Sequence, residues 1–248
     1  MDKKYEPHWS NYLNQFNLPS SYFQNIPTKT NKFCVIIEPR KMEILIKVIK
    51  NFMYLLQNKG WGLIVVHGTD NEEFVKSGLS GWKNVHYIKL NVSNLTPTTF
   101  DRLLTGSTLF WDKLLKIGCE KSLFFQSDAV LLKDNVDDFI NYDYVGAPWP
   151  TNLFRQTINV GNGGLSLRDT STMIEIINSC KKIYTNEDVY FGHGCIELNK
   201  KVPTIDEAMK FSVETIYYND PCGMHKPQIE RFPSYQHYAE LLSKKHVS

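Results

Sequence analysis

The sequence predicts one α/β domain in which helices flank a central mixed, mostly parallel sheet. Three observations lead to this prediction. The chain has 248 residues, 42% of them hydrophobic, which is enough to bury the core of one large domain. Its first half alternates short apolar runs with helical patterns, and a β-α-β order gives parallel strands with right-handed crossovers. The apolar stretch at 121–132 is typical of a strand buried on both faces.

Residues 1–31 are predicted to form an irregular arm that lies over the domain. They are polar and aromatic, and prolines at 7, 19 and 27 interrupt any regular period. Residues 32–248 are predicted to form the domain itself, because they contain no internal repeat, low-complexity tract or linker.

Short apolar runs bounded by turn residues predict strands, and apolar residues three or four positions apart predict helices. In chain order these patterns indicate a strand at 33–37, a helix at 42–57, strands at 62–68 and 85–90, a helix from Thr98 or Thr99 to Gly118, and a strand at 121–125. An extended aromatic segment follows at 142–150, then an apolar strand after the glycines at 161–164, and helices at 171–181, from 186 and at 206–210. From Lys226 onward the chain is polar and aromatic.

The bulk properties narrow the classes of function. A net charge of +2 gives no reason to expect a nucleic acid or a membrane surface as a partner. We predict no membrane span, because no apolar run is long enough, and no signal peptide, because the N-terminus lacks an apolar segment. The five cysteines are scattered and include no C-x-x-C pair, which favours a reduced, cytoplasmic protein.

The polar insert Gln126-Ser127-Asp128 interrupts the stretch at 121–132. A carboxylate inside an apolar run is costly to bury unless a donor or a cation accompanies it. Either the strand ends near Phe125 and Asp128 caps a turn, or Asp128 lies at the carboxyl end of the strand and holds a divalent metal.

Four other places also allow two interpretations. Arg40, directly after the first strand, is either a solvated charge or a contact to phosphate or uracil. The cluster Gly161-Asn162-Gly163-Gly164 is either a tight turn that needs positive φ or a close approach to a ligand. The Glu187-Asp188 pair either caps a helix or supplies a base that deprotonates an acceptor hydroxyl. The His225-Lys226 pair either belongs to a simple loop or contacts a metal and a phosphate.

Other sites are disfavoured. The sequence has no phosphate loop and no G-x-G-x-x-G after the first strand, which argues against a kinase or a dehydrogenase. A zinc site would need His193, Cys195, Cys222 and His225, whose spacing is irregular.

Eight short segments in a fixed order resemble a known family. They lie at 37–40, 103–105 with 110–111, 125–128, 142–149, 160–168, 186–189, 211–214 and 225–227. They are similar to glycosyltransferases of the GT-A type, and most closely to the DUF5672 family of bacteria, eukaryotes and giant viruses. The resemblance implies a single GT-A, Rossmann-like domain with a nucleotide-binding half at 32–132 and an acceptor and sugar half at 133–248.

The resemblance also implies roles for individual residues. Asp128 stands at the last Asp of the D-x-D motif of GT-A enzymes and, with His225, would bind Mn²⁺ or Mg²⁺. Gln126 replaces the first Asp, so it can hydrogen-bond ribose but adds no charge. Asp188 would be the catalytic base, with Glu187 as the second candidate. The residues that would contact the nucleotide-sugar donor are Arg40, Gln126, Ser127, Asp128, Trp149, Asn162, Gly163, Gly164 and Lys226.

The activity implied by the resemblance is a metal-dependent transfer of a hexosyl or deoxyhexosyl group from a nucleotide-sugar. A UDP-sugar is the expected donor, and a hydroxyl of a glycan or another molecule is the expected acceptor. Inversion with a carboxylate base is the expected course, and retention stays open. The missing first Asp leaves an alternative, a non-catalytic protein that binds nucleotide-sugars or glycans. A nucleotidyltransferase is a more distant one.

Overall fold

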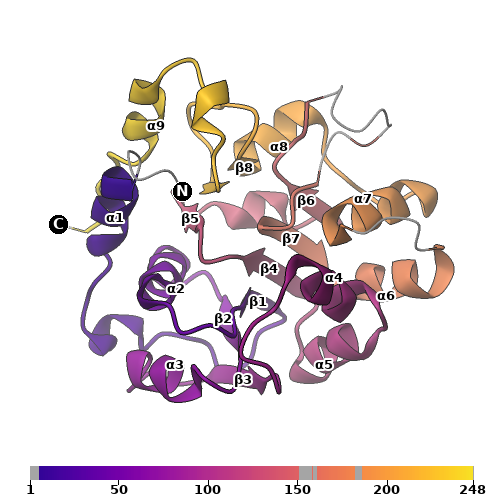
Figure 1. Ribbon diagram of the computed structural model, residues 1–248, viewed down its shortest axis with the longest axis horizontal. Helices are drawn as coiled ribbons and strands as arrows, with labels where there is room; N and C mark the ends of the chain where they lie inside the picture. The colour runs from indigo at the N-terminus through magenta and orange to yellow at the C-terminus, as the bar shows by residue number, and fades with distance from the viewer. Residues whose placement is uncertain (1–5, 151–157, 159–160, 182–185, 248) are drawn as a thin grey trace.

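The computed structural model describes residues 6–150, 158, 161–181 and 186–247. Its centre is a six-stranded sheet with the order β3-β2-β1-β4-β7-β6, and helices lie around it (Figure 1). The strands are β1 (Lys32–Ile37), β2 (Gly62–His67), β3 (Val85–Lys89), β4 (Lys121–Phe125), β6 (Tyr144–Gly146) and β7 (Leu165–Asp169). The first four are parallel to one another, whereas β7 is antiparallel to both β4 and β6. The predicted fold class, a mixed and mostly parallel sheet flanked by helices, is confirmed.

A smaller sheet begins directly after the insert Gln126-Ser127-Asp128. Its order is β5-β9-β8, and its strands are β5 (Ala129–Leu131), β8 (Ser212–Val213) and β9 (Gly223–His225). The apolar stretch at 121–132 therefore contains two strands in two sheets, with the insert between them. Because β9 is antiparallel to β5 and pairs His225 with Ala129, a strand rather than a simple loop carries His225 to the insert.

Two large hydrophobic clusters, one on each face of the main sheet, form most of the core of the described residues. The helices are α1 (Glu6–Asn14), α2 (Glu43–Leu55), α3 (Glu72–Gly78), α4 (Pro97–Thr105), α5 (Leu109–Ile117), α6 (Thr170–Ser179), α7 (Glu187–Glu197), α8 (Ile205–Phe211) and α9 (Tyr235–Leu241), with short 3₁₀ helices η1 (Ser20–Phe23), η2 (Val136–Phe139) and η3 (Ile229–Arg231). Side chains of a strand point alternately to the two faces. Along β1, Cys34 and Ile36 pack with α1, α2 and α3, while Val35 packs with α4 to α7.

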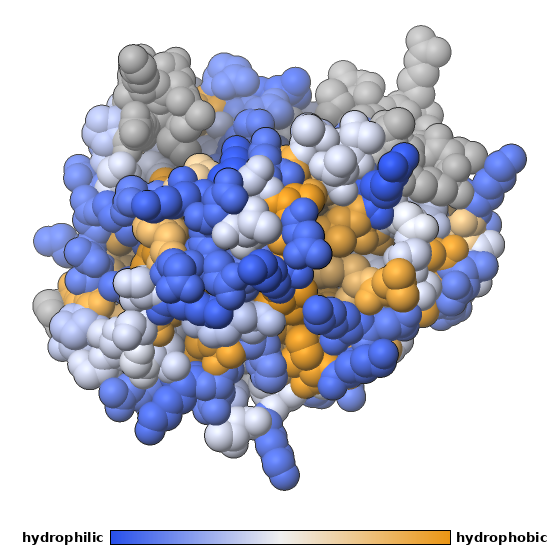
Figure 2. All heavy atoms as spheres, turned by 60° about the horizontal axis from the view of Figure 1, so that its bottom comes forward, coloured by the Kyte–Doolittle hydropathy of each residue, from blue (hydrophilic) through white to orange (hydrophobic). Residues whose placement is uncertain are grey.

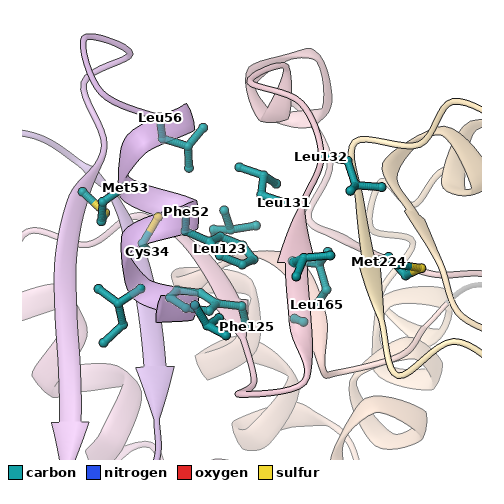
Figure 3. Close-up of a cluster of buried hydrophobic side chains, with 14 of the residues drawn as sticks. Cys34, Phe52, Met53, Leu56, Leu123, Phe125, Leu131, Leu132, Leu165 and Met224 are labelled. Atoms are coloured by element: carbon teal, nitrogen blue, oxygen red, sulfur yellow. The ribbon is translucent and has the colours of Figure 1, made fainter. Parts of the chain in front are cut away.

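The core under α2 is tightly packed where β4 ends. Figure 3 shows Phe52 of α2 and Phe125 of β4 next to each other, and their stacked ring centroids are 3.9 Å apart. Leu131 of β5, Leu165 of β7 and Met224 of β9 belong to the same cluster. This packing holds both sheets together immediately beside the polar insert.

The helix predicted from 98 to 118 is instead two helices, α4 and α5. The start also differs from the prediction: the Oγ1 of Thr96 accepts a hydrogen bond from the Thr99 N–H, and Pro97 occupies the first helical position. Proline is suited to that position because its missing N–H would have no partner inside the helix. Gly106 ends α4 after Thr105. The helices α3 and α9 were also not predicted from the sequence pattern.

The N-terminal arm is not irregular, contrary to the prediction. The helix α1 covers residues 6–14, with Pro7 in its first turn, where proline is tolerated. Trp9, Tyr12, Leu13 and Phe16 recur at helical spacing and are buried in the cluster that contains α2. The prolines misled the prediction because each one lies at or outside the end of a helix.

The surface is mainly hydrophilic on the face shown in Figure 2, where apolar side chains emerge in a band near the middle. Leu109, at the start of α5, is the most exposed large hydrophobic residue of the described part, at 76%. Within the ranges given above, no helix combines the length and the hydrophobicity needed to cross a membrane.

Candidate active site

A cavity of about 400 Å³ lies at the edge of the main sheet where β1 and β4 end. Because β1 and β4 are adjacent and parallel, with Ile36 opposite Phe125, the segments that follow them leave the sheet side by side. The segment leading into α4 and the start of α7 form the other walls. The predicted residues that line it are Arg40, Gln126, Ser127, Asp128, Glu187 and Asp188. Open α/β sheets bind ligands at the carboxyl ends of their strands, so this cavity is the candidate site.

Asp128 and His225 meet beside the cavity. The Nε2 atom of His225 lies 3.3 Å from Oδ1 of Asp128, and its Nδ1 atom lies 3.7 Å from Oε1 of Glu214. The ring is buried, and neither nitrogen has a hydrogen-bond partner among the described residues. Burial would lower the pKa of His225, but the two carboxylates raise it to about 9. At neutral pH the ring is therefore a cation between two acids.

This arrangement fits a divalent metal ion. Two adjacent ligands, each about 2.1 Å from an octahedral ion, lie about 3 Å apart. The observed separation of Nε2 and Oδ1 is 3.3 Å. Burial would raise the pKa of Asp128, but His225 and the charge of Lys226 keep it below its ordinary value, so the carboxylate is ionised. A metal ion would replace the proton on His225.

The rest of the metal's coordination would have to come from substrate or water. In the part of the chain that the structure describes, no three His, Cys, Asp or Glu side chains form a cluster that could hold a metal. The alternative zinc set does not assemble, because Cys195 and Cys222 are buried in the clusters on opposite faces of the sheet.

The glycine cluster packs against candidate residues. Its positive φ falls on Asn162, at 58°, whose Oδ1 accepts a hydrogen bond from the Gly164 N–H. A Cβ on Gly163 would lie 1.9 Å from Oε1 of Glu187, and one on Gly164 would lie 2.1 Å from the His225 ring. These two glycines are thus required by the close approach of side chains of the site.

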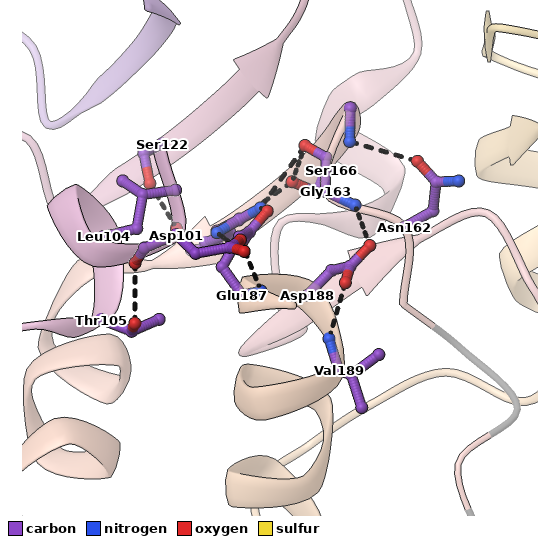
Figure 4. A network of polar contacts seen from close by, with 12 residues as sticks. Asp101, Leu104, Thr105, Ser122, Asn162, Gly163, Ser166, Glu187, Asp188 and Val189 are labelled. Carbon is purple, nitrogen blue, oxygen red and sulfur yellow. Dashed lines mark hydrogen bonds and ion pairs between the residues drawn. The ribbon is translucent and has the colours of Figure 1, made fainter. Parts of the chain in front are cut away.

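Glu187 and Asp188 lie side by side at the start of α7 (Figure 4). Both carboxylate oxygens of Glu187 accept hydrogen bonds from Arg168, at 2.7 and 3.0 Å. Asp188 instead accepts from the N–H groups of Gly163, at 3.2 Å, and Val189, at 2.8 Å. Burial and the charge of Glu187 raise the pKa of Asp188 to about 6. Asp188 is therefore suited to exchange a proton near neutral pH, whereas Glu187 is occupied by an ion pair.

A family model described as "Protein of unknown function (DUF5672)" matches residues 85–225, which is more than half of the chain. The chain belongs to the DUF5672 family. The match runs from β3 to β9 and so includes Asp128, the glycine cluster, Asp188 and His225. The family resemblance of the sequence is thereby confirmed. No curated protein matches the chain in sequence.

Two solved glycosyltransferase structures are similar to this DUF5672 chain. The galactosyltransferase LgtC, in complex with donor and acceptor sugar analogs, is 14% identical, with 85% of this chain and 95% of that chain covered and a TM-score of 0.47. The apo form of the glycosyltransferase GlyE from Streptococcus pneumoniae TIGR4 is 12% identical, with 88% of this chain and 61% of that chain covered and a TM-score of 0.51. The likeness to GlyE shows that this DUF5672 member has the predicted GT-A fold.

Arg40 of the DUF5672 chain lies on the cavity wall formed after β1. Its Nε and Nη2 atoms donate to the carboxylate of Glu38 at 2.8 and 2.6 Å, and this pairing raises the pKa of Arg40. The Arg40 side chain is nevertheless 52% exposed, so part of the guanidinium faces solvent. Arg40 is therefore oriented by a buried acid while it remains accessible to an anion.

Five predicted donor contacts lie outside the lining of the cavity, and two of them are the glycines at 163 and 164 described above. Trp149 is only 6% exposed and covers Gly161. Asn162 is buried within the glycine cluster. Lys226 is exposed and has a φ of 35°, and its backbone N–H donates to the carbonyl oxygen of Asp128.

Several side chains that shape the site had no role predicted from the sequence. Asp101 lines the cavity and accepts the backbone N–H of Glu187 at 3.0 Å, which caps α7. Glu38 orients Arg40, and Glu214 faces His225. Of these side chains and Arg168, only Arg168 stands out in the sequence. An Arg within an apolar strand requires an acidic partner, and this requirement would have pointed to a buried ion pair.

We expect Gly164→Ala to displace His225, because the new Cβ would occupy the space of the ring. Such overpacking should lower the free energy of unfolding by roughly 1–3 kcal/mol. The measurement is denaturant unfolding of Gly164→Ala in two backgrounds, wild type and His225→Ala. The cost should become much smaller in the His225→Ala background, since that change makes room for the methyl group. An equal cost in both backgrounds would contradict the steric explanation.

Proposed function

We propose that this chain is a metal-dependent glycosyltransferase that transfers a sugar from a nucleotide-sugar to a hydroxyl acceptor with inversion. The observation that carries the proposal is that Asp128 and Asp188 line the same cavity of about 400 Å³, one after β4 and the other at the start of α7. The fold shared with the glycosyltransferase GlyE supports it. We expect a UDP-sugar as the donor and a hexosyl or deoxyhexosyl group as the sugar that is transferred.

Asp128 and His225 would hold Mn²⁺ or Mg²⁺. The ion would neutralise charge that develops on the departing nucleoside diphosphate. Arg40, Gln126 and Ser127 lie on the same side of the cavity and can donate hydrogen bonds to phosphate, ribose or base. The exposed charge of Lys226, close to Asp128, would add to the attraction for a diphosphate.

Asp188 would act on the acceptor. In its ionised form it can accept the proton of an acceptor hydroxyl while the oxygen attacks the anomeric carbon. An inverting reaction needs this base on the side of the sugar opposite the leaving group. The segment after β4 and the start of α7 both line the cavity, so one bound ligand can contact Asp128 and Asp188.

We also propose a cytoplasmic location. The five cysteines, at 34, 119, 180, 195 and 222, are buried and form no disulfide, as expected of a protein from a reducing compartment.

The test is thermal unfolding with a panel of nucleotide-sugars, with and without Mn²⁺. A ligand present at 100 times its Kd stabilises the folded state by about 2.7 kcal/mol, so binding should be visible as a higher Tm. The Asp128→Ala variant should lose the part of the shift that depends on Mn²⁺, because it lacks one of the two metal ligands. Asp206→Asn, an exposed change on α8, is the matched control.

Product analysis separates the proposal from its rivals. A glycosyltransferase should release nucleoside diphosphate and form a glycoside, whereas a nucleotidyltransferase releases pyrophosphate from a nucleoside triphosphate. Donor binding without glycoside formation across a broad acceptor panel would favour the binding protein. Full turnover by Asp128→Ala in the presence of a strong chelator would refute the metal-dependent transferase.

A further inference from the structure

Arg168 is a completely buried arginine on β7. Its guanidinium lies among aromatic rings, with 4.7 Å to the ring centroid of Phe124, 5.1 Å to Tyr144, 5.6 Å to Phe191 and 6.0 Å to Trp111. A buried charge in such surroundings is costly without close partners. The hydrogen-bond partners of Arg168 therefore indicate what the buried charge contributes to the structure.

Arg168 joins the glycine cluster to the first turn of α7. Its Nη1 and Nη2 atoms bind Glu187, and Nη2 also donates to the carbonyl oxygen of Gly163 at 3.4 Å. Its Nε atom donates to the Ser166 hydroxyl at 2.9 Å, and that hydroxyl donates to the same Gly163 carbonyl at 3.2 Å. Figure 4 shows Gly163, Ser166 and Glu187 gathered at this point. All three guanidinium nitrogens are used in fixing the two segments against each other.

Asp188 belongs to one of the two segments that Arg168 fixes and is hydrogen-bonded to the other. It follows Glu187 in the chain, and its Oδ2 atom accepts the Gly163 N–H at 3.2 Å. The peptide groups of Gly163 are thus held by Arg168 and Ser166 at the carbonyl and by Asp188 at the N–H. A shift of either segment would move the Asp188 carboxylate relative to the cavity.

We propose that Arg168 is a positioning residue that holds the Asp188 carboxylate in one orientation at the cavity wall by clamping Glu187 and Gly163. The inference rests on the proposed transferase function and places Glu187 in the clamp rather than in proton transfer. A lysine cannot replace the clamp, because its single ammonium lacks the planar fork of donors. A displacement of about 1 Å at a reacting group can lower a rate by roughly 100-fold.

The first test is Arg168→Lys, compared with Arg231→Lys, an exposed arginine of η3. We expect kcat to fall by roughly 100-fold in Arg168→Lys with little change in the KM of the donor, and neither value to change in Arg231→Lys. A second readout needs no activity. The Gly163 amide resonance should follow the ionisation of Asp188, with a midpoint near pH 6 in the wild type, because its N–H donates to that carboxylate. Arg168→Lys should lose this dependence.

A second variant decides the case if Arg168→Lys does not fold. Arg168→Met combined with Glu187→Leu removes both buried charges and should fold, because a buried ion pair can be replaced by apolar residues. The same losses of kcat and of the Gly163 titration are expected. Because Glu187 and Arg168 also act on the pKa of Asp188, the midpoint of the titration can move in this variant for electrostatic reasons alone. A folded double variant with wild-type kcat, in which the Gly163 resonance still follows the ionisation of Asp188 at any midpoint, would overturn the inference. If the wild type transfers no sugar, the proposed function fails, while the Gly163 resonance still tests the clamp.

Discussion

Replacement of Asp188 by Asn should lower the transfer rate by roughly 10²- to 10⁴-fold, which is the usual contribution of a general base. Asparagine keeps the shape of the side chain and can still accept the Gly163 N–H, but it cannot take a proton from an acceptor hydroxyl. Donor binding should change little, because Asp188 lies on the wall formed by α7 and not among the residues that follow β1 and β4. Steady-state kinetics with a saturating donor would measure the effect.

The pH dependence of the reaction gives a second measure of the same residue. Burial and Glu187 raise the pKa of Asp188 to about 6, so the wild-type rate should fall below that pH as the base becomes protonated. The residual activity of Asp188→Asn should lack this acidic limb, and Asp206→Asn should retain it. A wild-type rate in Asp188→Asn would show that another group removes the proton.

The strand ends of the site could be predicted from the sequence, but the contacts between distant segments could not. The apolar runs at 33–37 and 121–125 are long enough to identify β1 and β4, and the polar residues after each run therefore had to meet at one edge. His225 reaches Asp128 only through β9, a strand of three residues that gives no readable periodicity. The family resemblance supplied this pairing, and local pattern did not.

The same limit applies to Glu187 and Asp188. In the sequence they are equivalent neighbouring acids at the start of a helix. Their surroundings differ because Arg168, nineteen residues before Glu187, binds Glu187, whereas Gly163 of the glycine cluster binds Asp188. An Arg in an apolar strand indicates that an acidic side chain lies nearby. The identity of that acid is determined by the antiparallel pairing of β7 with β4 and by the packing of α7. Such choices depend on tertiary structure.

The largest expected effect on stability belongs to Arg168→Met. Without Arg168, the carboxylate of Glu187 would be left buried without its ion-pair partner, and breaking such a pair costs roughly 3–5 kcal/mol. For a chain of this size, each kcal/mol corresponds to about 2–4 °C in Tm, so the variant should melt roughly 6–20 °C below the wild type. Differential scanning calorimetry would measure the change.

The double variant Arg168→Met with Glu187→Leu should recover much of this stability, because neither charge then remains in the core. A single variant as stable as the double would contradict the explanation, since the Glu187 charge would then have found water or another partner. In the double variant, the stability of the fold is expected to recover while the transfer activity stays low. Its core should regain stability through apolar contacts, but no apolar side chain can donate to Gly163 or bind the first turn of α7, so Asp188 should remain misplaced. Burying the Arg168–Glu187 ion pair costs more free energy than burying apolar side chains in its place. The pair is then explained by the orientation that it gives to Asp188.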